Sequence, residues 1–240
     1  MNYKIWGEDN IDQNTKDQMD EACSLPEVVG GALMPDAHLG YGLQIGGVLA
    51  LKNAISPSAV GYDIACRMKL TIFADAPTAL SGPRKNSFIE ALETQTSFGV
   101  GSETEGLDHS VMDKDWGITE ITGSLKDVAY KQLGSSGSGN HFVEFGDIYV
   151  DKDQAEILGL PYFGAFIALM SHSGSRGPGH KTCTFYNDIA KDLANVTDNT
   201  KLTCLDMDTS AGQEYFAAMN LMGDFAQANH DVIHDRISKK

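Results

Sequence analysis

Three short segments of the chain contain residues that could bind metal ions or phosphate groups. In the first, GYDIACR, the carboxylate of Asp63 and the thiol of Cys66 stand three residues apart and can face one side of a tight turn. A carboxylate with a thiolate suits a borderline divalent ion such as Mn²⁺ or Zn²⁺. Arg67 or a bound metal would favour the thiolate. The alternative is a surface Asp63 beside a structural Cys66, because free cysteine is often buried.

The second segment is GSGNHFVE, residues 137–144. Small residues ahead of a histidine allow backbone amides to approach a phosphate closely. Asn140 could donate to a phosphate oxygen, His141 could bind a metal, and Glu144 could accept from a purine edge. The alternative is a flexible loop that leads into a strand with a core histidine. The glycine-rich stretch lacks the GK[ST] ending of a P-loop, which argues against an ATPase of that type.

The third segment is SHSGSRGPGH, residues 171–180. It places His172 at the end of a predicted strand, followed by small residues and Arg176, whose guanidinium is suited to pair with phosphate. Pro178 fits the first turn of a following helix. The alternative is a solvated loop with an incidental histidine.

Other pairs of polar residues are weaker signals. Asp36 and His38 could orient a ligand. His230 and His234 stand at positions i and i+4 of a predicted helix, but Asp231 follows the first of them, so the zinc-protease pattern HExxH is absent. A solvated helix face is the simpler interpretation of these two histidines. No GxSxG motif indicates a serine hydrolase.

The elements that must position these residues follow from the apolar pattern. The sequence predicts an α+β fold, since strands and helices alternate without a regular βαβ rhythm. Residues 99–123 read as loop, Gly134 as a helix C-cap, and residues 134–141 as a flexible turn that runs into a strand. Helices are predicted over 11–22, 84–97, 125–133, 179–195 and 209–236, and strands over 45–51, 68–74, 141–150 and 163–170.

The composition excludes several classes of protein. The 240 residues carry a net charge of −15, which is the wrong sign for a protein that holds nucleic acid through a broad basic surface. RNA binding would therefore need a local basic pocket or bound cations. The four cysteines form no CxxC pair. The N-terminus lacks the apolar region of a secretory signal, and no apolar run reaches the roughly 18 residues of a membrane span. We therefore expect a cytoplasmic protein with reduced thiols and no membrane contact.

Taken together, these segments resemble the RtcB family of RNA ligases. The resemblance covers roughly residues 30–238, in the family's order, through the segments MPDAHLGYGLQIGGVLA, SPSAVGYDIACRM, QLGSSGSGNHFVEFG, SHSGSRGPGH and EYFAAMNLMGDFAQANHDVI. It implies an RtcB-like α+β fold with mixed sheets and packed helices around a central metal and nucleotide pocket. It also implies that residues 1–240 form a single catalytic domain, apparently without the C-terminal part of the family.

The resemblance implies an activity as well. The family uses GTP and two Mn²⁺ ions to join an RNA 3′-phosphate or 2′,3′-cyclic phosphate to a 5′-hydroxyl, in tRNA splicing or RNA repair. The expected partners are RNA with such ends, GTP and a possible protein activator. The residues that match family metal ligands are Asp63, Cys66, His141 and His172, with Cys66 bridging both ions. The positions that match nucleotide or phosphate contacts are Asn140, His141, Glu144 and Arg176.

Two departures from the family qualify this prediction. Ala65 and Arg67 replace glycines of a DIGCG-like run, which suggests a divergent subgroup. Family members also continue through another metal histidine and the guanylylated histidine, both of which we expect to lie beyond Lys240, so the nucleophile is unknown within this chain. The alternatives are a metal- and nucleotide-binding remnant without ligase activity, or a metal-dependent phosphoesterase that activates water.

Overall fold

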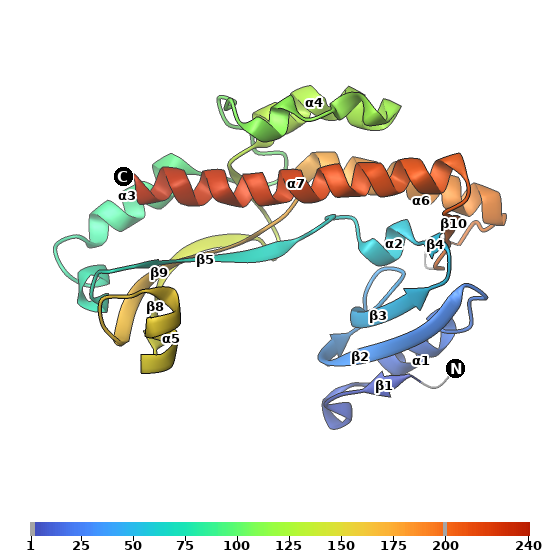
Figure 1. Ribbon diagram of the computed structural model, residues 1–240, viewed down its shortest axis with the longest axis horizontal. Helices are drawn as coiled ribbons and strands as arrows, with labels where there is room; N and C mark the ends of the chain where they lie inside the picture. The colour runs from blue at the N-terminus through green and yellow to red at the C-terminus, as the bar shows by residue number, and fades with distance from the viewer. Residues whose placement is uncertain (1–2, 199–200) are drawn as a thin grey trace. The chain divides into compact units, whose positions relative to one another are not determined.

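The computed structural model describes residues 3–198 and 201–240. The chain combines helices with strands that form several small sheets (Figure 1), which confirms the predicted α+β class. The helices are α1 (Gln13–Ala22), α2 (Pro57–Val60), α3 (Lys85–Gln95), α4 (Glu120–Gln132), α5 (Lys152–Leu158), α6 (Arg176–Ala194) and α7 (Ser210–Ser238). The strands are β1 (Lys4–Ile5), β2 (Val28–His38), β3 (Ile45–Leu51), β4 (Ala54–Ile55), β5 (Arg67–Phe73), β6 (Ser97–Phe98), β7 (Ser135–Gly137), β8 (Phe142–Val150), β9 (Gly164–Ser173) and β10 (Leu205–Asp206).

The chain forms two compact units. Unit 1 comprises Met1–Ile64, Gly117–Gly123 and Gly179–Asn220, and unit 2 comprises Ala65–Trp116, Ser124–Pro178 and Leu221–Lys240. Three helices, α4, α6 and α7, contribute residues to both units. None of the helices in the described ranges is long and apolar enough to cross a membrane.

Unit 1 contains the sheet β1-β2-β3, against which α1 packs. The helix begins at the N-cap Asp12, whose carboxylate accepts a hydrogen bond of 2.7 Å from the amide of Thr15. Strand β2 runs through the glycine-rich stretch that carried no strand prediction. A Cβ at Gly31 would lie 2.5 Å from Met19 Cε and 3.0 Å from Cys23 Sγ, so glycine lets α1 approach the strand closely.

Unit 2 is built on an antiparallel sheet in the order β5-β9-β8, with β9 in the middle. One face packs on α3 and on the part of α7 in this unit, which runs alongside the sheet in Figure 1. Burial of each large aliphatic side chain in such a core stabilises the fold by roughly 1.5–3 kcal/mol. The buried members of this core are Ala91, Val143, Leu169, Ile233 and Ile237.

Alternation along β9 assigns side chains to the two faces of this sheet. Ser171 contacts α7 through its hydroxyl, so it faces the core side. His172, the next residue, therefore faces the opposite side. Met68 and Phe142 pair with His172 in the neighbouring strands, and Met68 is about half exposed. The face that carries His172 packs on α5 at the far end of the sheet, through Val150, Ala155 and Phe166, and is half exposed at Met68, beside His172.

Most predicted elements are confirmed within a few residues, but three details were wrong. His172 lies inside β9 rather than past its end. Residues 134–141, predicted as a flexible turn, contain the buried strand β7, which pairs with β6. The predicted loop 99–123 contains two 3-10 helices and the first turn of α4. Gly134 has φ = 84° directly after α4, as its C-cap prediction requires.

Candidate metal centre

Sheet register brings one thiol and two imidazoles together in unit 2. Cys66 directly precedes β5, His172 is the second-last residue of β9, and His141 directly precedes β8. The three residues meet at one end of the sheet, because the starts of β5 and β8 both pair with the last residues of β9. Cys66 Sγ lies 2.9 Å from His172 Nε2 and 3.6 Å from His141 Nε2, and the two imidazole centroids are 5.5 Å apart.

The backbone fixes which nitrogen of His141 faces the thiol. His141 Nδ1 lies 3.1 Å from the carbonyl oxygen of Ser136, which can only accept, and 3.4 Å from Arg176 Nη1, which can only donate. The shorter contact favours the tautomer in which Nδ1–H donates to the carbonyl. The lone pair then lies on Nε2, the atom that faces Cys66. A hydrogen bond from Nδ1 to a backbone carbonyl is the usual way in which a protein orients a metal-binding histidine.

These donors suit a divalent metal ion. Sulfur and nitrogen ligands of one tetrahedral ion lie about 3.6 Å apart, given bond lengths of about 2.3 and 2.1 Å. The separation between Cys66 and His141 matches this value. The separation between Cys66 and His172 is shorter, so one of these side chains would move by roughly 0.7 Å to admit an ion between them. Cys66 is exposed and both histidines are partly exposed, which leaves the cluster accessible.

Asp63, the predicted carboxylate ligand, belongs to unit 1, where it is the second-last residue of the first segment. It stands three positions before Cys66, so their Cα atoms can lie no more than about 11 Å apart even in a fully extended chain. Chain connectivity therefore limits how far this carboxylate can lie from the thiol.

The two residues that depart from the family pattern have structural consequences. Ala65 has φ = 61°, in the left-handed region that favours glycine. Arg67 donates from Nε to the carbonyl of Ala65 at 3.0 Å and from Nη2 to the carbonyl of Gly223 at 3.3 Å. The arginine thus holds the strained turn that presents Cys66, and it anchors the turn to α7.

We expect Ala65→Gly to stabilise unit 2. An L-residue in the left-handed region costs about 1–2 kcal/mol, part of which is offset because glycine adds freedom to the unfolded chain. The net gain should be roughly 0.5–1 kcal/mol in the free energy of unfolding, measured by urea denaturation. A loss of stability would show that the turn needs the alanine methyl.

The predicted phosphate-binding residues lie around the same strand ends. Asn140 precedes His141 and is exposed, and Glu144 is exposed on the face of the sheet that carries His172. Arg176, the first residue of α6, donates from Nε to Ser135 Oγ at 3.1 Å. Its guanidinium covers Gly137, where a Cβ would lie 2.2 Å from Nη1. The predicted Asp36–His38 pair lies in unit 1, where His38 Nδ1 contacts the Asp36 carbonyl at 2.8 Å.

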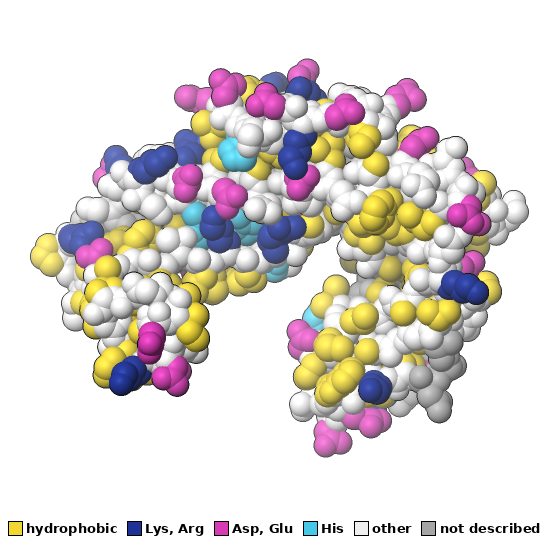
Figure 2. Space-filling model, in the orientation of Figure 1, with side chains coloured by type: hydrophobic (Ala, Val, Ile, Leu, Met, Phe, Trp, Pro, Cys, Tyr) yellow, Lys and Arg dark blue, Asp and Glu magenta, His cyan; other side chains and the backbone are white. Residues whose placement is uncertain are grey.

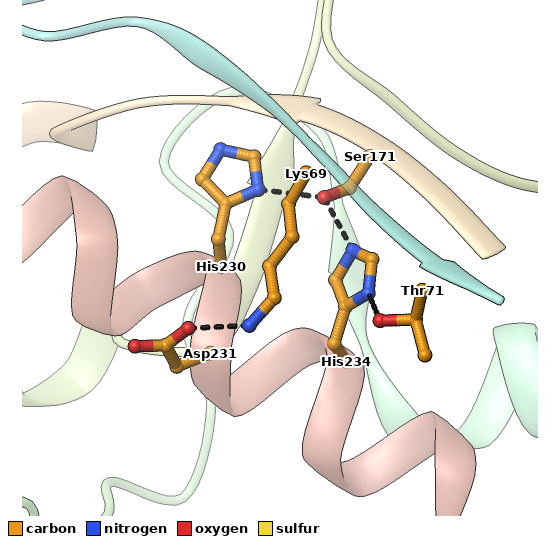
Figure 3. A network of polar contacts seen from close by, with 6 residues as sticks. All are labelled: Lys69, Thr71, Ser171, His230, Asp231 and His234. Carbon is orange, nitrogen blue, oxygen red and sulfur yellow. Dashed lines mark hydrogen bonds and ion pairs between the residues drawn. The ribbon is translucent and has the colours of Figure 1, made fainter. Parts of the chain in front are cut away.

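Sequence reasoning misjudged His230 and His234. They do not lie on a solvated face of α7, because their side chains are only 1% and 2% exposed. Figure 3 shows both imidazoles pointing to Ser171, whose Oγ lies 2.6 Å from His230 Nδ1 and 2.8 Å from His234 Nε2. Thr71 Oγ1 lies 2.7 Å from His234 Nδ1, and Lys69 pairs with Asp231 on the same helix. Hydroxyl groups on buried strand positions opposite the helix were the missed signal.

One end of this network fixes the direction of all its hydrogen bonds. His230 Nε2 must donate to the carbonyl of Ser173, 3.0 Å away, so His230 Nδ1 accepts from the hydroxyl of Ser171 when the ring is neutral. Ser171 Oγ then accepts from His234 Nε2–H, and His234 Nδ1 accepts from Thr71. Burial and nearby Lys69 lower the pKa of His234 to about 4, and burial also lowers the pKa of His230. Both rings are therefore neutral at neutral pH.

We expect the stability of unit 2 to fall in mild acid. The folded pKa of His234 lies below its ordinary value of 6.5, so the unfolded chain takes up the proton first as the pH falls. The stabilisation is complete above pH 6.5 and is lost progressively toward pH 4. Between pH 7 and pH 5, this ring alone should cost about 2 kcal/mol of unfolding free energy. Urea denaturation at the two pH values measures this, and an unchanged pH dependence in His234→Gln would contradict it.

The surface charge agrees with the acidic composition. On the face shown in Figure 2, Lys and Arg side chains occur in small groups interspersed with Asp and Glu. Cationic groups that belong to the neighbourhood of the cluster include Arg67 and Arg176. Any anionic ligand at this site would therefore meet local positive charge rather than a broad basic surface.

Comparison with known proteins places this site in a family context. The chain matches the family described as "tRNA-splicing ligase RtcB" over residues 18–120 and 114–240. It is 33% identical to "RNA-splicing ligase RtcB homolog 1" of Entamoeba dispar, across 92% of this chain and 48% of that protein. It is 30% identical to "tRNA-splicing ligase RtcB" of Methanococcus maripaludis, across 94% and 55%, and 28% identical to the protein of that name from Thermococcus kodakarensis, across 96% and 57%.

The chain spans about half the length of the curated relatives it matches. The matched ranges include all three segments that meet at the strand ends of unit 2. They also cover nearly the whole of residues 1–240. On this match, the chain belongs to the RtcB tRNA-splicing ligase family.

Proposed function

We propose that this protein is a GTP- and Mn²⁺-dependent RNA ligase, or the metal-binding part of one. It would join RNA 3′-phosphate or 2′,3′-cyclic phosphate ends to 5′-hydroxyl ends, in tRNA splicing or RNA repair. The observation that carries the proposal is that Cys66, His141 and His172 lie together at one end of the sheet, within a chain that matches this family. RNA with such ends and GTP are the proposed partners, and a protein activator is a further one.

Four side chains would hold two Mn²⁺ ions in this proposal. Cys66 would bridge the ions, His141 and His172 would each bind through Nε2, and Asp63 would supply a carboxylate. Such ions organise phosphate oxygens and neutralise charge that develops in phosphoryl transfer. In the Irving–Williams order Zn²⁺ binds a site of this kind more tightly than Mn²⁺, so metal titrations should include both. A reduced thiol fits the cytoplasm, where we propose that the reaction takes place.

The chain's other residues would bind and orient the nucleotide. Asn140, exposed beside His141, would donate to a phosphate oxygen. Arg176 would provide positive charge for the same phosphates, since its guanidinium already lies next to His141. Glu144, two residues along β8 from Phe142 and on the face of His172, would accept from the guanine edge.

The ligase proposal is tested with the natural full-length protein, Mn²⁺ and GTP labelled at the α-phosphate. We expect a covalent protein–GMP adduct and, after addition of RNA with 3′-phosphate and 5′-hydroxyl ends, joined RNA. Cys66→Ala should abolish both. Absence of the adduct at every Mn²⁺ concentration would overturn the proposal.

The same experiment separates the two alternatives. A phosphoesterase predicts cleavage of a 2′,3′-cyclic phosphate with metal but without GTP. A binding remnant predicts that Mn²⁺ and GTP bind while neither adduct nor cleavage product forms. Either result would replace the ligase assignment.

A further inference from the structure

One face of α7 holds the backbone segments that carry the two metal-site histidines. We infer that Asn229 and His230 are positioning residues, which fix His141 and His172 from the packed side of the sheet. This inference rests on the proposed metal site. It concerns only unit 2, where all of these residues lie.

His230 forms hydrogen bonds to the residues of β9 on both sides of His172. Its Nδ1 lies 2.6 Å from the hydroxyl of Ser171, and its Nε2 lies 3.0 Å from the carbonyl of Ser173 (Figure 3 shows the first of these contacts). The two contacted residues immediately flank His172, whose own side chain points to the other face of the sheet. A single buried imidazole thus fixes the strand at the residues that set the direction of the His172 side chain.

Asn229 connects β7, β9 and the C-cap of α4. Its Nδ2 lies 3.0 Å from the carbonyl of Ser135 and 3.1 Å from Ser173 Oγ, and its Oδ1 accepts from the amide of Gly134 at 2.7 Å. The side chain is fully buried. In a site without water such hydrogen bonds are strong, and leaving one unmade is costly.

From Asn229 the hydrogen bonds continue to His141. The hydroxyl of Ser173 donates to the carbonyl of Ser136 at 2.7 Å, and the same carbonyl accepts from His141 Nδ1–H at 3.1 Å. Ser173 is fully buried, so its hydroxyl orients this carbonyl without competition from solvent. The series Asn229–Ser173–Ser136–His141 therefore favours the proton on His141 Nδ1, against the Arg176 Nη1 donor that lies 3.4 Å from the same nitrogen. That choice leaves Nε2 available to a metal.

Groups that orient metal ligands in this way typically contribute 10–100-fold to metal affinity. We expect Ser173→Ala and Asn229→Ala to weaken Mn²⁺ binding by that factor. In the metal-free protein, long-range ¹H–¹⁵N NMR should show His141 as one Nδ1–H tautomer, and both variants should convert it to a mixture. His230→Asn should weaken Mn²⁺ binding while His141 keeps its tautomer, because it acts on the His172 side.

His234→Asn is the matched control. It removes an equally buried imidazole one turn along α7, which contacts Ser171 and Thr71 but neither Ser173 nor Ser136. Ser171 keeps its hydrogen bond to His230 in this variant. We expect it to lower the free energy of unfolding, yet to leave the Mn²⁺ dissociation constant within about twofold and the His141 tautomer intact.

Two results would overturn the inference. One is an unchanged His141 tautomer in Ser173→Ala, and the other is a loss of Mn²⁺ affinity in the His234 control as large as in the Asn229 and Ser173 variants. If Asn229→Ala does not fold, Ser173→Ala decides, because it removes only one oxygen atom. If the unmodified protein binds no Mn²⁺, the proposed function fails, while the tautomer measurement still decides whether Asn229 and Ser173 position His141.

Discussion

Cys66→Ala is expected to remove most bound Mn²⁺ and to raise the dissociation constant at least about 100-fold, equivalent to about 2.7 kcal/mol. The physical reason is that the Cys66 thiol lies 2.9 Å from His172 Nε2 and 3.6 Å from His141 Nε2. Its loss would therefore remove a ligand from any ion that either histidine binds. Isothermal titration calorimetry and elemental analysis measure affinity and stoichiometry. The fold should be unaffected, because the Cys66 side chain is exposed.

Cys204→Ala is the control for this substitution. Cys204 is partly buried in unit 1, and burial raises the pKa of its thiol to about 11. It therefore stays protonated at neutral pH and should bind no metal, because the thiolate is the metal ligand. Unchanged metal stoichiometry in Cys66→Ala would show that the Cys66 thiol has another role.

The second large effect is expected for His172→Ala. His172 Nε2 lies closer to the thiol than His141 Nε2 does, and His172 is the histidine that β9 contributes among the described residues. We expect an affinity loss of about 100-fold, with the free energy of unfolding changed by less than about 1 kcal/mol because the side chain is only partly buried. Calorimetry and urea denaturation give the two values separately.

His180→Ala provides the comparison, since His180 belongs to the same sequence motif. It lies in unit 1, is exposed, and has its ring 5.3 Å from that of Tyr62. This variant should bind Mn²⁺ as the unmodified chain does. Equal losses in the two histidine variants would mean that the affinity change is indirect.

The sequence predicted much of the fold because apolar periodicity and helix-ending residues act locally. The strand β3 and the C-cap at Gly134 follow from such local signals. Strand β2 and strand β7 were missed, because glycine and serine residues have low strand propensity. What makes them strands is tertiary: Gly31 admits α1, and Ser135 pairs with Ser97 far away in the chain.

The candidate site shows a similar division. Local spacing left Cys66, His141 and His172 open to structural interpretations, and motif order made them metal-ligand predictions. The structure adds that sheet register brings their side chains together. The buried roles of His230 and His234 escaped prediction, because their partners Ser171 and Thr71 lie about 60 and 160 residues away in the chain and are brought close only by packing. The roles of Asn140, Glu144 and Arg176 stay predictions.

The most direct test of the central claim is anomalous diffraction at the manganese absorption edge, from crystals of the protein soaked in Mn²⁺. We predict an anomalous peak within bonding distance of Cys66 Sγ, and of Nε2 of His141 or His172, that disappears in crystals of Cys66→Ala. The absence of any such peak beside Cys66, while the ion occupies another position in the same crystal, would contradict the account.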